Sequence, residues 1–251
     1  MSMYRESFAL ALRLHTTILL AMVLDIALQV LVEKDILGDK AGISVTIIWS
    51  LPAFFAHLHI LFPEKAERDF NVIKISGFFL RNLGLIILSM LPGVLVAISM
   101  LQAIQAEVGG DEDQMYILTT FFLIIPTAIT FLLVFGVLGT LLPAYVTGRE
   151  RGIGKALSRA KESFFPIIGR TIIGPAPILL LSLFLVGFLP VSLNVPLVYL
   201  TDNWIINTPF FLIMFAALLL QGWAIVMMAW ILSKAFLATE GKQKGKWQEA
   251  N

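Results

Sequence analysis

The chain consists of six long apolar runs separated by shorter polar segments. Each run reaches the roughly 20 residues that an α-helix needs to cross about 30 Å of hydrocarbon. Lipid offers no partner to backbone N–H and C=O groups, so a spanning segment must satisfy them internally, as a helix does. The pattern therefore predicts an all-α polytopic membrane protein with six transmembrane helices, over residues 14–32, 43–62, 77–104, 116–146, 171–200 and 209–236.

The domain organisation follows from the same runs. We expect residues 1–238 to form a single six-helix transmembrane domain and residues 239–251 to form a polar cytoplasmic tail. Composition agrees with a membrane protein, because 58% of the residues are hydrophobic and only 14% are charged, against about 25% charged residues in soluble proteins. The net charge of +1 argues against a nucleic-acid partner. The chain has no cysteine, which excludes disulfides and thiolate sites.

The positive charge is distributed unevenly. Sixteen of the 18 Lys and Arg residues lie before the first run, in the connections between runs two and three (counting Arg81 at the start of run three) and between runs four and five, and near or after the end of run six. Basic connections resist translocation, so this distribution predicts that both termini lie in the cytoplasm. The acidic segment QAEVGGDEDQ would then lie outside.

An internal repeat is visible in the apolar runs. Phe78 and Phe164 each begin a Phe-Phe pair that is followed by a cation, a glycine and a later proline, and Phe121 and Phe210 occupy matching places in the next runs. The offsets are 86 and 89 residues. We predict parallel helix-pair repeats, each with a cytoplasmic amphipathic segment, an outward span and an inward span; a third, more diverged copy would begin at Tyr4.

Residues 148–170 form the most basic segment, with six Lys or Arg residues. Apolar residues recur from Ile153 at the spacing of one helical face, and Pro166 is expected to end the helix where the fifth span begins. This pattern predicts a cytoplasmic amphipathic helix with its apolar stripe in the acyl region. In the alternative interpretation, the cations only set topology. The candidate contacts for anionic lipid head groups are Arg151, Lys155, Arg159 and Arg170.

The stretch LLPAYVTGRERGIGKALSRAKESFFPIIGR resembles inner-membrane proteins of the YciC type and the membrane domain attached to some glycerophosphodiester phosphodiesterases. The resemblance covers about two thirds of the chain, at its C-terminal end. It implies a multi-span domain of the bacterial cytoplasmic (inner) membrane, without the phosphodiesterase portion. A tryptophan that often follows the Ala-Leu element in these families is missing here. The matching positions are Pro143, Gly148, Gly152, Ala156, Leu157, Arg159, Ala160, Phe164, Gly169 and Arg170.

A carboxylate lies inside the first apolar run. Asp25 is near the expected bilayer midplane, where an ionised group is costly unless it has a partner. Gln29 is one turn away, and Gln221 is at comparable depth in the sixth run. We expect a protonated or water-exposed carboxyl group in a midplane polar site formed by these three residues. A proton or substrate site and a structural interhelical hydrogen bond are both compatible with this pattern.

Two other polar features have structural interpretations. His57 and His59 cannot both face His15, because residues two apart on a helix point in nearly opposite directions. We therefore expect interfacial histidines and no metal or haem. Ser89, Gly93 and Ala97 form a row of small residues that favours close helix packing.

The chain lacks the nucleophile elbow G-x-S-x-G, the zinc motif H-E-x-x-H, the phosphate-binding G-x-x-x-x-G-K-[ST] and a G-x-G-x-x-G followed by an acidic residue, so we predict no catalytic residue, cofactor or metal. The leading hypothesis is a non-enzymatic accessory subunit or scaffold of a larger membrane assembly. The alternative is a small-molecule or lipid transporter with a midplane site at Asp25, and a membrane enzyme comes third. The expected partners are membrane lipids with anionic head groups at the cytoplasmic face and other membrane subunits.

Overall fold

A computed structural model describes residues 3–37, 41–63, 72–108, 112–148, 152–201 and 205–249. Apart from one isolated bridge between Leu200 and Ile206, the regular structure in these ranges is helical. The helices are α1 (Met3–Arg13), α2 (His15–Glu33), α3 (Ala41–Leu61), α4 (Val72–Val108), α5 (Glu112–Leu138), α6 (Leu141–Thr147), α7 (Ile153–Ile173), α8 (Pro175–Gly187), α9 (Leu189–Ser192) and α10 (Thr208–Glu249).

The predicted all-α polytopic fold is confirmed. Six helical segments are long and apolar enough to cross a membrane, so the chain is a multi-pass membrane protein. They lie at His15–Glu33, Ile43–Leu61, Ile73–Met100, Leu123–Thr147, Ile153–Ser192 and Thr208–Gly241.

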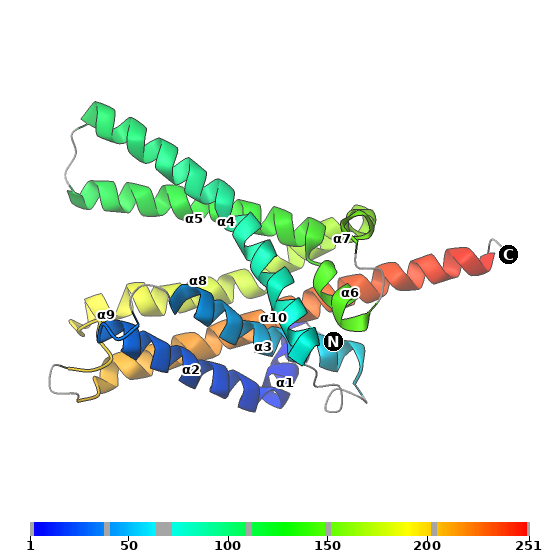
Figure 1. The fold of residues 1–251 in the computed structure, drawn as a ribbon, viewed down its shortest axis with the longest axis horizontal. Helices are drawn as coiled ribbons and strands as arrows, with labels where there is room; N and C mark the ends of the chain where they lie inside the picture. The colour runs from blue at the N-terminus through cyan, green and yellow to red at the C-terminus, as the bar shows by residue number, and fades with distance from the viewer. Residues whose placement is uncertain are drawn as a thin grey trace.

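The spans are arranged as consecutive antiparallel pairs (Figure 1). Helix α2 packs on α3, α4 packs on α5, and α8 packs on α10. An amphipathic helix precedes the first and the last pair: α1 before α2, and α7 before α8. This order agrees with the predicted three-unit pattern, with one exception. Helix α4 is a single continuous helix from Val72 to Val108, in which the amphipathic segment and the span are not separated.

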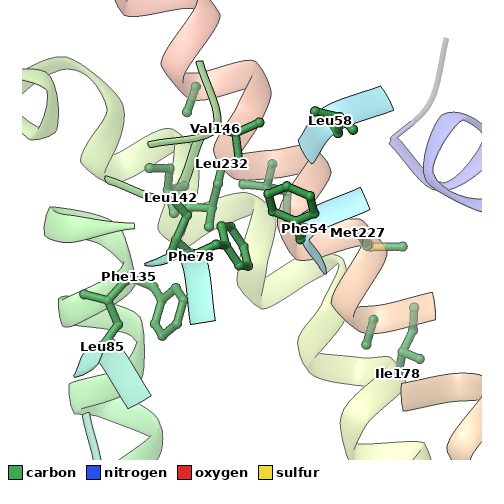
Figure 2. Close-up of a cluster of buried hydrophobic side chains, with 14 residues drawn as sticks. Phe54, Leu58, Phe78, Leu85, Phe135, Leu142, Val146, Ile178, Met227 and Leu232 are labelled. Atoms are coloured by element: carbon green, nitrogen blue, oxygen red, sulfur yellow. The ribbon is translucent and has the colours of Figure 1, made fainter. Parts of the chain in front are cut away.

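Helix α10 lies at the centre of the fold, where it contacts α1, α2, α3, α6, α7 and α8. A cluster of buried apolar side chains forms between α10 and its neighbours, and Figure 2 shows Phe54, Phe78 and Leu232 at its middle. The rings of Phe54 and Phe78 meet edge to face, with centroids 5.4 Å apart. This cluster packs the base of the α4–α5 hairpin against α3, α6 and α7.

Several boundaries differ from the sequence-based expectation, and the fifth candidate span lies at Ile153–Ser192 instead of 171–200. Helix α7 continues through Pro166, and the chain bends instead at Gly174, with φ −92° and ψ −91°. A single proline removes one backbone hydrogen bond, whereas the Gly174-Pro175 step disfavours the helical conformation at the residue before proline. Helix α10 continues to Glu249, so residues 239–249 of the predicted tail extend the last span as a helix.

The α4–α5 hairpin is joined by the predicted row of small residues. Thr130 Oγ1 donates to the carbonyl oxygen of Ser89 over 2.6 Å. A Cβ at Gly93 would lie 1.9 Å from Thr127 Oγ1 and 3.0 Å from the Thr127 backbone nitrogen. These contacts confirm a packing role for Ser89 and Gly93; the side chain of Ala97 lies outside the described residues.

The close approach at Gly93 predicts that a methyl group added there lowers stability, whereas one added at Gly84 on the same helix does not. Gly93→Ala is expected to destabilise the protein by about 1–3 kcal/mol through overpacking against Thr127. Gly84→Ala is the matched control, because a Cβ there meets nothing within 4 Å. Thermal unfolding of both variants in detergent checks the difference. Equal stability of the two variants would contradict the helix contact.

Candidate functional site

The Asp25 carboxylate is enclosed by three helices. Asp25 is only 4% exposed, and its Oδ2 accepts a hydrogen bond of 2.8 Å from the indole N–H of Trp49 on α3. Gln29 Nε2 donates to Oδ1 over 3.5 Å. The Trp49 ring lies against Gly222 of α10, where a Cβ would come within 3.3 Å of it. Asp25 is therefore buried between hydrogen-bond donors, and the expectation of a water-exposed group is not met.

Gln221 does not join this site. Within the described part of the chain, no hydrogen bond links it to Asp25 or Gln29, and Gly222 is the residue of α10 that faces Ile18 and Trp49. Successive residues of an α-helix differ by about 100° in direction, so a one-residue offset turns the Gln221 side chain away. The third member of the site is therefore Trp49 and not Gln221. A tryptophan inside an apolar run, with an indole N–H that needs an acceptor, is the feature of the sequence that could have indicated this.

A polar row continues from Asp25 along α2 to the far end of the bundle. Asp25, Gln29 and Glu33 follow at intervals of four residues on one helical face. Glu33 accepts hydrogen bonds from the backbone N–H groups of Tyr199 (2.7 Å) and Leu200 (3.1 Å). Lys34 Nζ donates to the Leu200 carbonyl oxygen over 3.3 Å. The end of α2 thereby holds the α9–α10 connection.

Tyr199 anchors this connection in the bundle. Its side chain is buried and packs edge to face on Phe210 at 5.1 Å. Burial, and to a lesser degree the charges on Asp25 and Glu33, raise the pKa of the Tyr199 phenol to about 12.

The histidines are separated from one another. His57 is buried, contrary to the interfacial position that we expected, and its Nδ1 lies 2.7 Å from Ser233 Oγ of α10. Nδ1 of His59 lies 3.0 Å from the Phe55 carbonyl oxygen, and Nδ1 of His15 lies 2.8 Å from that of Leu12. No group of three or more possible metal ligands occurs among the residues that the structure describes.

The basic segment divides into exposed and buried cations. Lys155 and Arg170 are exposed, so their contact with lipid head groups stays a prediction, whereas Arg151 lies outside the described residues. Arg159 differs from the prediction, because its side chain is only 1% exposed. Its Nη2 and Nε lie 3.0 Å and 3.1 Å from Glu240 Oε1 of α10, and its guanidinium lies over the Phe236 ring.

The burial of Arg159 has a packing cause. Helix α7 turns a face of mostly small residues towards α5 and α10, and Arg159 belongs to this face. A helical wheel of α7 alone cannot show Glu240, because this residue belongs to α10 and follows Arg159 by 81 residues. The exposed apolar residues of α7 include Ile153, Leu157 and Phe165, so only part of the predicted stripe is available to lipid.

The ion pair predicts unequal effects from its two ends. Glu240→Gln removes a carboxylate that faces a buried guanidinium and is expected to cost about 3 kcal/mol of stability. Arg159→Met removes the buried charge while keeping an apolar stem and should cost less. Lys155→Met on the exposed side of α7 is the control, with an expected effect below about 0.5 kcal/mol. Unfolding in detergent measures all three, and a Lys155 effect as large as that of Glu240 would refute the assignment.

Comparisons with protein-family models, curated proteins and solved structures each returned no match. The resemblance of the α6–α7 region to YciC-type proteins and to phosphodiesterase membrane domains therefore stays a prediction. The role of the chain has to be argued from its own geometry.

Proposed function

We propose that this chain is a non-enzymatic integral membrane protein that serves as an accessory subunit or scaffold of a larger membrane assembly. The observation that carries the proposal is the α4–α5 hairpin. Its base packs on α3, α6 and α7, and its remaining length diverges from the other helices (Figure 1).

The diverging part of the hairpin has a wide apolar surface. The large exposed side chains are Ile87, Leu88, Leu91, Val94, Leu95 and Ile98 on α4 and Ile124, Ile125 and Ile129 on α5. Helices associate in lipid through packing of complementary surfaces, since lipid tails are as apolar as leucine. A projecting helix pair has two sides on which the helices of another subunit can pack.

The buried polar groups support a structural role. Asp25 bonds to Trp49, His57 bonds to Ser233, and Arg159 pairs with Glu240. Each contact joins two different helices. Polar groups used in this way hold the helix bundle together, which suits a scaffold better than a site that must exchange partners with a substrate.

The proposal includes the orientation and the surroundings of the chain. We infer a bacterial inner-membrane location with both termini in the cytoplasm, on the basis of the basic connections and the resemblance. The exposed cations Lys155 and Arg170 would then meet anionic head groups at that face.

Site-specific photo-crosslinking in intact membranes tests the scaffold role. A photoreactive residue at Leu95, which is 57% exposed on α4, is expected to form a discrete adduct with a second membrane protein. The matched control is Leu180, which is 66% exposed on α8 and outside the hairpin. Adducts with lipid alone at both positions, or the same protein adduct from both, would contradict a docking role for the hairpin.

A transporter is the second candidate, because the polar row of Asp25, Gln29 and Glu33 extends from the interior of α2 to its end. Asp25→Asn keeps an oxygen that can accept the Trp49 hydrogen bond. We expect this variant to fold and to assemble like the wild type, in accordance with the scaffold proposal. Proton-coupled flux into liposomes is the measurement: flux in the wild type that disappears in Asp25→Asn would favour transport and contradict this expectation.

A further inference from the structure

An apolar groove lies at the elbow between α1 and α2, where α10 closes its third side. Its volume is about 640 Å³, within the range of roughly 300–1,000 Å³ that is typical of small-molecule sites. The principal walls are Phe8 and Leu12 of α1, His15 and Leu19 of α2, and Leu219 and Trp223 of α10. This groove is separate from Asp25 and from the basic helix α7.

The fold builds the groove by pinning one face of α1 onto the bundle. Ser7 Oγ accepts a hydrogen bond of 3.3 Å from the indole N–H of Trp223, and the Tyr4 hydroxyl donates to the Ile173 carbonyl oxygen. Leu14 then turns the chain into α2, and Figure 1 shows α1 out of line with α2. Phe8 and Leu12 are left on the open side, 49% and 57% exposed.

The groove begins at the edge of the spanning region and continues into it. The first span starts at His15, and the α10 wall from Phe215 to Trp223 belongs to the last span. Eight residues of helix correspond to about 12 Å. Helix α1 is amphipathic, as expected of a helix that lies in the membrane interface. The walls thus extend from the start of the first span into the last span, where acyl chains would lie, and α1 lies beside the start of the first span.

The exposed side of α1, which carries Phe8 and Leu12 of the groove wall, also carries positive charge. Arg5 and Arg13 are exposed on α1. The carboxylate of α1, Glu6, is engaged with α10: Oε2 lies 3.7 Å from Lys234 Nζ and accepts a hydrogen bond from Trp230. Arg5 shares a helical face with Phe8 and Leu12, at intervals of three and seven residues. An anionic group on this side of α1 would therefore meet arginines while its apolar part lies against the groove.

We propose that this groove binds one acyl chain of an anionic phospholipid from the surrounding bilayer, with the lipid phosphate at Arg5 and Arg13. The apolar walls and the cations of α1 together match the two parts of such a lipid. The proposal does not rest on the scaffold function, because the hairpin that carries that function is elsewhere in the fold.

Photo-labelling of the full chain tests this site. The protein is reconstituted in nanodiscs that contain phosphatidylglycerol with a diazirine on its acyl chain, and labelled peptides are mapped by mass spectrometry. Label is expected to concentrate on residues 8–19 and 215–223 above the level on the exposed face of α8. Ala216→Phe, at an exposed position in the groove wall, should reduce this label to that level. Ala27→Phe, also exposed but outside the groove, is the matched control and should retain the label.

The head-group preference is tested separately. Each of Arg5→Gln and Arg13→Gln should weaken the preference for phosphatidylglycerol over phosphatidylcholine about five-fold, whereas Lys161→Gln on α7 should not. Label spread evenly over all lipid-facing helices, label unaffected by Ala216→Phe, or groove residues crosslinked to a second protein chain would each overturn the proposal. A scaffold without a lipid site, and a lipid site without a docking hairpin, give different results in the two labelling experiments.

Discussion

A polar side chain in hydrocarbon has no water to bind, and the arrangement of the helices depends on how that constraint is met. The hydrogen bond between Asp25 and Trp49 joins α2 to α3, and the contact between His57 and Ser233 joins α3 to α10. Single interhelical bonds of this kind contribute only about 0.6 kcal/mol on average. Their larger effect is selective, because any other rotation of these helices would leave a buried polar group unpaired.

Glycine supplies the close approach that these bonds require. A Cβ at Gly222 would come within 2.7 Å of Ile18, and one at Gly139 within 2.6 Å of Leu232. At the bend between α7 and α8, Gly174 lies against Met3 and Met227. All three contacts involve α10, and such close crossings leave room for the seven helices that contact it. Packing at such crossings replaces the hydrophobic driving force that lipid removes.

The sequence predicts the features that depend on local chemistry and misses those that depend on a second helix. Span length follows from hydrocarbon thickness, so the ends of the first three spans were predicted to within four residues, whereas the fourth candidate span begins 7 residues later and the fifth 18 residues earlier than expected. The row of small residues at Ser89 and Gly93 was also recognisable, because it depends only on the spacing along one helix. The Asp25 site was predicted only in part, because the rotation of α10 that places Gly222 rather than Gln221 at Trp49 is a property of the packed bundle.

Two arginines show why counting charges along the chain does not predict the role of each cation. Arg159 and Arg170 lie on the same helix and count equally towards the cytoplasmic bias, yet one is buried against Glu240 and the other is exposed. The difference arises from the length of α10, which extends far enough past the apolar core to bring a carboxylate to α7. A C-terminal segment that reads as a polar tail is therefore part of the helix bundle at least as far as Glu240, and the last span and the basic helix hold each other in place.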